Sequence, residues 1–426
     1  MSFSTPSHLL LHAAVSAAAS LLATLLHLPS LLLHGLHTYI HPDSLGGGDG
    51  DGVRAAIRRP SDAPSSSSDL RRRNRSKGHR PDFDESGAQL FRLRLADAHL
   101  RTRLYFPEYR TSFLSAAVAL PNLALCSLLP RDPPASAAIP ALAALVAAAH
   151  LLLALAKLSL ERSSSRRSEK ELSVLSGFLG FLAALLIVFH LSPSVFDFDL
   201  GKSDAAISKA AAAILAGCLS GILFIPAARA ARAFWLGTDQ LRWNLSVVSC
   251  SAPVQILLYA AVLSGAAVPL LWVNPVVVPA GEVQSLEFKE YRIWALMASA
   301  FSQLLVLRAN LQMYLNEAVL CWYQRLHASR APDMDYGRAK VFLHNHYLCL
   351  VALQFFAPPV LALVLLGLSQ LRGNLFGGVL FLGSLVDCSD LLKEIALFIA
   401  WWIAFIWAIL TMLKLALYRS GFLIVS

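Results

Sequence analysis

Nine apolar stretches, each long enough to cross a lipid bilayer, recur along this chain and constrain its fold more than any other feature. A helix needs about 20 mostly apolar residues to cross a hydrocarbon core of about 30 Å. Such segments fold as helices because lipid offers the backbone no hydrogen-bond partners. We therefore predict an all-α membrane protein, a polytopic bundle of about nine transmembrane helices. The stretches lie at 9–28, 112–129, 137–158, 172–191, 210–228, 247–273, 293–315, 347–371 and 395–418.

The overall composition supports this class. Of the 426 residues, 56% are hydrophobic and only 15% are charged, which is unlike a soluble globular protein. The net charge of +9 is explained by basic cytosolic loops, so we expect no nucleic-acid partner. The six cysteines are scattered singly and without metal-ligand spacing, which leads us to expect neither a disulfide framework nor a metal site. We also expect no cofactor.

The chain divides into a first transmembrane helix within 1–36, a cytosolic loop at 37–111 and a helical bundle at 112–426. No Lys or Arg precedes the first apolar stretch, so it reads as a retained span rather than a cleaved signal peptide. The loop contains glycine, serine and arginine runs and is predicted to be basic, low in complexity and largely disordered.

Two parts of this loop allow alternative readings. The basic run at 71–75 acts either as a topology anchor or as a contact for anionic lipid headgroups. Near the end of the loop, apolar residues at 91, 93 and 95 alternate with Arg92 and Arg94. This alternation predicts a short half-exposed strand, or else an amphipathic segment on the membrane surface.

The loops between the predicted spans alternate in basic charge. Under the positive-inside rule, loops rich in Lys and Arg lie in the cytosol. We therefore predict a multi-pass protein of the plasma membrane or an endomembrane, with a lumenal or extracellular N-terminus and a cytosolic C-terminus. The basic residues of the odd-numbered loops include Lys157, Arg162, Arg166, Arg167, Lys170, Arg229, Arg232, Arg242, Arg325, Arg330, Arg338 and Lys340.

The seventh stretch, 293–315, is apolar enough to span a membrane but carries an unusual number of polar side chains. At about 100° per residue, one face of a single helix holds Ser299, Gln303, Asn310, Tyr314 and Glu317. Polar groups are costly in lipid, so this helix is predicted to lie inside the bundle. A nearly opposite face holds Arg308, Gln312 and Asn316.

The polar side chains of this helix form the candidate site, and their role has two readings. Arg308 either extends to the membrane surface or pairs with a carboxylate or phosphate in a cavity between helices. Gln303 and Asn310 either hold neighbouring helices together or line a pathway for an ion or small solute. The full candidate set is Gln303, Arg308, Asn310, Gln312, Asn316 and Glu317.

The same residue inventory argues against a membrane enzyme. Catalysis inside a membrane relies on titratable groups that converge in one pocket, and the predicted spans contain almost no carboxylate. His12, His150 and His190 fall in different spans, so no pair of base and nucleophile is visible. We expect a protein without enzymatic activity.

Several short motifs, taken in order, resemble the transmembrane protein 161 family. The resemblance covers most of the chain and implies a multi-span membrane protein of a family without an established biochemical activity. It places Arg308, Gln312 and Asn316 within a family motif but transfers no ligand set. The motifs are Tyr105-Phe106-Pro107-Glu108-Tyr109, Phe224-Ile225-Pro226 with Arg229, Leu271-Trp272-Val273 with Pro275, Arg308 with Leu311-Gln312 and Tyr314-Leu315-Asn316, Tyr347-Leu348-Cys349 with Ala352-Leu353-Gln354 and Ala357-Pro358, and Trp401-Trp402-Ile403-Ala404.

These observations lead us to expect a regulator or scaffold of other membrane proteins. The alternative is an ion or small-solute pathway along the polar seventh helix. The expected partners are the lipid bilayer and other membrane proteins, while the sequence does not identify a small-molecule ligand.

Overall fold

The structure is a computed structural model of the 426-residue chain. It describes residues 5–41, 54–57, 90–128, 137–161, 167–192, 194–198, 206–238, 250–273, 286–328, 335–371, 375 and 389–423. Most of the loop predicted to be disordered lies outside these residues.

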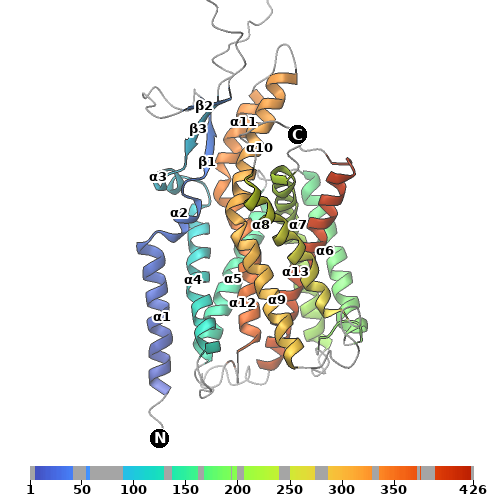
Figure 1. Cartoon of the computed structure of the whole chain (residues 1–426). Coiled ribbons are helices and arrows are strands. Elements are labelled where there is room, and N and C mark those ends of the chain that lie inside the picture. Colours follow the sequence, from blue (N-terminus) through green and yellow to red (C-terminus); the bar gives the residue numbers. More distant parts are fainter. Residues whose placement is uncertain are drawn as a thin grey trace, which may run out of the picture.

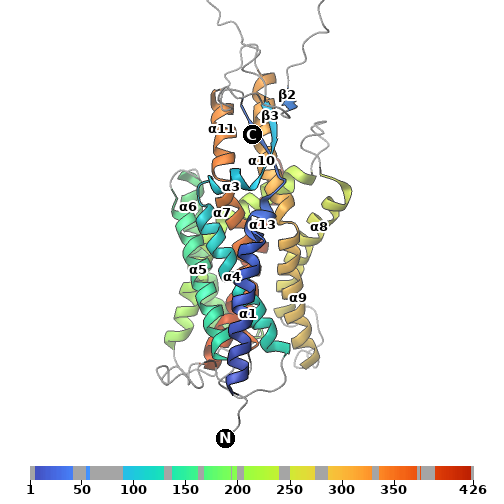
Figure 2. The same cartoon turned by 90° about the vertical axis from the view of Figure 1, so that its left-hand side faces the viewer.

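Long helices stand side by side and form a bundle, with the two chain termini at opposite ends (Figures 1 and 2). Helix α11 (Asp335–His346) projects at one end, which we call the α11 end. The positive-inside prediction assigns this end to the cytosol. The bundle helices are α1 (Thr5–Leu25), α4 (Phe106–Leu128), α5 (Ala138–Leu160), α6 (Arg167–Leu186) with its continuation η4 (Ile187–Leu191), α7 (Ala206–Thr238), α8 (Ala252–Ala267) with η7 (Val268–Trp272), α9 (Leu286–Leu305), α10 (Leu307–Ala328), α12 (Leu348–Ser369) and α13 (Ser389–Arg419).

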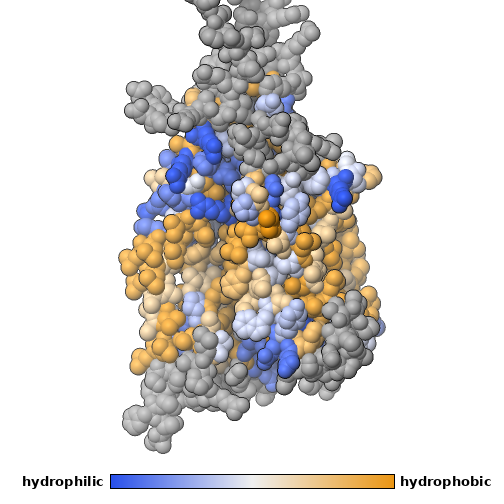
Figure 3. Space-filling model, viewed as in Figure 1, coloured by the Kyte–Doolittle hydropathy of each residue, from blue (hydrophilic) through white to orange (hydrophobic). Residues whose placement is uncertain are grey.

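The bundle surface has the character of a membrane protein. Figure 3 shows a hydrophobic band around the middle of the visible face, with hydrophilic residues gathered toward both ends. Six described helices are long and apolar enough to cross a membrane, or up to seven if α9 and α10 count as one broken span. Helices α1 and α4 are not among the six, so the predicted number of nine spans is not confirmed.

Helix α12 forms the centre of the bundle. It contacts α4, α5, α7, α9, α10 and α13, and 94% of its apolar window is buried inside the protein. A helix that is apolar on every side is suited to this position. Pro358 and Pro359 lie within α12, where neighbouring helices surround the backbone groups that each proline leaves unpaired.

The contact between α6 and α7 depends on small residues. A Cβ atom on Gly217 of α7 would lie only 2.6 Å from the Cβ atom of Phe181 on α6. Without a strong hydrophobic driving force in lipid, helices gain from such close backbone approach through van der Waals packing. Gly217 therefore permits these two helices to pack closely.

The seventh predicted span is a bent pair of helices rather than one continuous helix. Helices α9 and α10 meet at Val306 with a bend of 40°. The Val306 N–H bonds the Ser302 carbonyl and the Asn310 N–H bonds the Val306 carbonyl, so the chain turns without separating. The break means that faces computed for a single helix do not continue from 303 to 317.

A small sheet adds strands to the predicted all-helical fold. Strand β3 (Leu90–Arg94) lies between β1 (His37–Ile40) and β2 (Arg54–Ile57) and is antiparallel to both. The sheet lies beside α10 and α11 at the α11 end (Figure 1). Of the two readings of the alternation around Arg92 and Arg94, the structure therefore shows the strand. Short helices α2 (Leu28–Leu33) and α3 (Asp97–Arg101) connect the sheet to α1 and α4.

Candidate functional site

One polar face of α10 binds the sheet. Arg308 donates from Nη2 to the His34 carbonyl at 2.7 Å. One turn further, Gln312 Oε1 accepts from the His37 N–H at 2.9 Å while its Nε2 donates to the His37 carbonyl at 3.1 Å. Another turn on, Asn316 Oδ1 accepts from the Tyr39 hydroxyl at 3.1 Å. The four-residue spacing places these three side chains along the free edge of β1, which they cover.

The arrangement around Gly35 brings several positive charges together. Gly35 has φ +79°, and a Cβ atom there would lie 3.1 Å from Arg308 Nη2 and 3.2 Å from Arg94 Nη2. Burial, together with the positive charges of Arg92, Arg94 and Arg308, lowers the pKa of His37 from its usual 6.5. Arg308 is exposed, and its guanidinium binds the His34 carbonyl on this surface.

Helix α11 contacts the same strand at Thr38 and Tyr39. Asn345 donates from Nδ2 to the Tyr39 carbonyl at 2.6 Å and accepts a hydrogen bond from Thr38. Arg338 approaches His41 at 3.3 Å. The strand is therefore fixed by side chains of two helices.

The remaining polar groups of the predicted set lie elsewhere. Gln303 and Asn310 line a small space of about 50 Å³ whose other walls are mostly apolar, including Phe234 and Trp407. Asn310 Oδ1 and Ser299 Oγ are buried and have no hydrogen-bond partner within the described part of the chain. Gln303 and Asn310 thus share a site, while Glu317 belongs to another.

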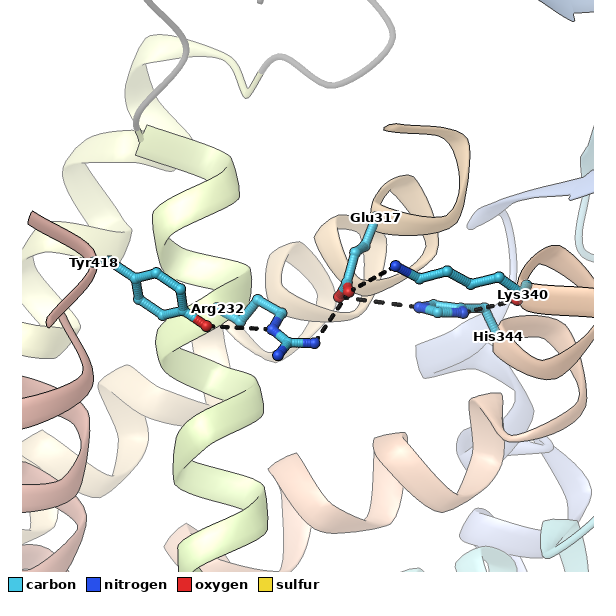
Figure 4. A network of polar contacts seen from close by, with 5 residues as sticks. All are labelled: Arg232, Glu317, Lys340, His344 and Tyr418. Atoms are coloured by element: carbon cyan, nitrogen blue, oxygen red, sulfur yellow. Dashed lines mark hydrogen bonds and ion pairs between the residues drawn. The ribbon is translucent and has the colours of Figure 1, made fainter. Parts of the chain in front are cut away.

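Glu317 lies at the centre of a charged cluster between α7, α10 and α11. Its side chain is only 6% exposed, and its Oε1 lies 3.1 Å from Arg232 Nη1 and 3.5 Å from Lys340 Nζ. His344 donates from Nδ1 to the Lys340 carbonyl, which directs Nε2 toward Glu317 Oε2 at 4.0 Å. Figure 4 shows these groups converging on the carboxylate, with the Tyr418 hydroxyl on the far side of Arg232.

A cavity of about 330 Å³ opens beside this cluster. Arg229 bonds Gln354 at its inner wall, and Lys414 of α13 lies over the Phe224 ring. The side chain of Arg232 is 37% exposed, so the cavity is reached from outside. Four tyrosines, Tyr314, Tyr336, Tyr347 and Tyr418, also line it.

The charges of this cavity are unequal. Arg229, Arg232, Lys340 and Lys414 supply four positive charges, and Glu169 and Glu317 supply two negative charges, which leaves an excess of two positive charges when His344 is neutral. A partly desolvated space with excess guanidinium and ammonium groups favours anions. We call this space the basic cavity.

Of the six candidate residues predicted from the sequence, only Glu317 lines the basic cavity. Arg229 and Arg232 were counted as loop charges because the fifth span was predicted to end at 228, whereas α7 continues to Thr238. The spacing of Arg229 and Arg232, followed by the apolar residues Phe234 and Leu236, was an available signal of a longer helix. No local pattern connected them with Lys340 or His344.

Comparison with known proteins agrees with the motif order. The family described as predicted transmembrane protein 161AB matches residues 204–376, which include α7 to α12 and most of the basic cavity. No solved structure matches the chain. Over residues 204–376, the chain is therefore similar to the transmembrane protein 161 family.

Proposed function

We propose that this protein is a non-enzymatic regulator or scaffold of other membrane proteins, and that it binds a phosphate-bearing anion in the basic cavity. The observation that carries the proposal is the convergence of Arg229, Arg232, Lys340 and Lys414 around a space of about 330 Å³. Guanidinium groups match phosphate oxygens geometrically, and lysine adds a point charge.

Glu317 gives the cavity a built-in competitor for its ligand. In the structure its carboxylate forms ion pairs with both Arg232 and Lys340. A bound anion weakens the ion pairs of these cations with Glu317, because the carboxylate and the anion compete for the same N–H donors. Ligand binding is therefore expected to rearrange the cluster.

Helix α11 offers a route from this cluster to the sheet. Lys340 and His344 face Glu317, whereas Arg338 and Asn345 contact the segment that contains β1. A shift of α11 toward or away from the cavity changes both sets of contacts. Such coupling between a ligand site and an exposed sheet supports a regulatory role more than a catalytic one.

The test is ligand-dependent thermal stability of the purified protein in detergent, with pyrophosphate and short-chain phosphatidylinositol 4-phosphate as separate probes. Stabilisation by pyrophosphate indicates a ligand from the aqueous phase, and stabilisation by the lipid alone indicates a headgroup. We expect Lys340→Gln with Lys414→Gln to abolish the stabilisation. Lys393→Gln is the matched control because Lys393 pairs with Asp390 at the opposite end. If neither probe stabilises the native protein, the proposal is wrong.

A second candidate function, an ion or solute pathway, is favoured by the break at Val306. Interrupted helices line substrate sites in many transporters, and Gln303 and Asn310 flank this break. Cysteine scanning along 299–316 with a membrane-impermeant thiol reagent, applied from each side, tests this idea. Labelling at 303 and 310 supports a pathway, whereas silence at both positions assigns these side chains to helix packing.

A further inference from the structure

Arg292, near the end of the bundle opposite α11, is a buried cation with an incomplete set of partners. Its side chain is 5% exposed, and Nη2 donates to Asp197 Oδ2 at 2.6 Å. The rings of Trp272 and Phe288 each lie 5.2 Å from the guanidinium carbon. Nε and Nη1 are buried, yet neither has a hydrogen-bond acceptor among the described residues.

This arrangement is costly unless another group accepts those hydrogen bonds. A buried donor without a partner loses its hydration without compensation, and the loss is larger for a charged group. Asp197 compensates Arg292 only in part, because its side chain is 27% exposed and its charge is better screened by solvent. A net positive potential remains at Arg292.

Arg292 lines a cavity of about 220 Å³. The apolar walls come from Phe198, Trp272 and Leu397, while Lys289 and Glu394 add one charge of each sign. Residues of the first two turns of α9 and α13 contribute to the lining, so the positive ends of two helix dipoles lie near the cavity. The aromatic wall and a guanidinium with two N–H groups that lack acceptors among the described residues suit a small organic anion.

We propose that this cavity, which we call the Arg292 cavity, is a second ligand site that binds a small carboxylate. The carboxylate accepts hydrogen bonds from Arg292, and its apolar part rests on Trp272 and Leu397. The site is independent of the basic cavity, which lies at the α11 end of the bundle. Under the charge-based topology, it opens to the lumen or the cell exterior.

The experiment measures the melting temperature of the purified full-length protein with butyrate and, at the same ionic strength, with chloride. We expect a saturable rise of about 2 °C or more with butyrate and none with chloride. Arg292→Lys keeps the charge but loses the guanidinium donors and should abolish the rise. Arg167→Gln, on a side chain that is 94% exposed, is the control and should preserve it.

A rescue experiment covers the case in which Arg292→Lys folds poorly. Asp197→Ala removes the carboxylate that pairs with Arg292, so we expect a lower melting temperature and a larger, saturable recovery with butyrate. Recovery in Asp197→Ala together with stabilisation of the native protein supports the site. The proposal is overturned if butyrate does not raise the melting temperature of the native protein, or if chloride raises it equally. This holds whatever the result with Arg292→Lys or Asp197→Ala.

Discussion

The side-chain amide of Gln312 makes both backbone hydrogen bonds of His37, accepting from its N–H at 2.9 Å and donating to its carbonyl at 3.1 Å. It acts as a neighbouring strand would, and so closes part of the free edge of β1. Arg308 and Asn316 extend the same contact by one turn of α10 on each side. The sheet is therefore attached to the bundle by side chains that a lipid-facing helix would not carry.

Gln312→Leu is expected to loosen β1 by about 2 kcal/mol, because it removes the two hydrogen bonds to His37, besides the one to Asn316, and leaves the outward-facing His37 backbone groups unpaired. Hydrogen exchange should show protection at 37–40 falling by about thirtyfold. Asn310→Leu is the matched control on another face of α10, since Asn310 Oδ1 has no partner in the described structure. Equal loss of protection in both variants would falsify this role of Gln312.

Acidification is expected to release the same strand. Burial and the charges of Arg92, Arg94 and Arg308 lower the pKa of His37, so the undocked state binds protons more readily than the docked state. Docking is strongest above the usual pKa of 6.5 and weakens as the pH falls below it. Protection factors at 37–40, corrected for intrinsic exchange, should fall between pH 7.5 and 5.5. His37→Asn should remove most of this dependence, and an unchanged dependence would assign it to another group.

Glu317→Gln is expected to destabilise the protein by about 2 kcal/mol, because Arg232 and Lys340 then face each other without a carboxylate. Partial exposure of Arg232 keeps the effect below that of a fully buried pair. The measurement is a melting temperature in detergent. Glu171→Gln removes an exposed pair with Arg167 and should leave the melting temperature almost unchanged. Matching effects in the two variants would contradict a special role for the cluster.

Gly217→Ala is expected to cost about 1–3 kcal/mol through overpacking between α6 and α7. The added methyl group would lie 2.6 Å from the Cβ atom of Phe181, so one helix has to move. Gly265→Ala is a suitable control, because its nearest neighbour would be at 3.7 Å, an ordinary contact. The melting temperature of Gly217→Ala should be clearly lower than that of Gly265→Ala. An unchanged melting temperature in Gly217→Ala would mean that α6 and α7 can move apart at little cost.

Hydropathy and alternation predicted the features that depend on local sequence. Long apolar stretches indicated the membrane helices, and the alternation around Arg92 indicated a strand. The break at Val306 was not predictable in this way, since leucines flank it and neither proline nor glycine marks it. The strand order β1-β3-β2 also depends on pairing between distant segments.

The candidate site was only partly predictable for a related reason. The polarity of α10 was visible, and Arg308, Gln312 and Asn316 share a face of it. Their partner, however, is the backbone around β1, which neither reading of Arg308 anticipated. Arg232 and Glu317 are 85 positions apart, so only tertiary packing reveals that they pair.

The pairing of α7 with later helices has a consequence for biosynthesis. The ribosome adds 85 residues after Arg232 before it reaches Glu317, the partner of that arginine. It adds 125 residues after Arg229 before it reaches Gln354. During that interval α7 enters the membrane with two guanidinium groups that have not yet met their final partners. Its C-terminal part is therefore expected to stay near the bilayer surface, or with the insertion machinery, until α10 and α12 arrive. Chains that stop before α12 would keep this charged helix incomplete, which gives cellular quality control a feature by which to recognise them.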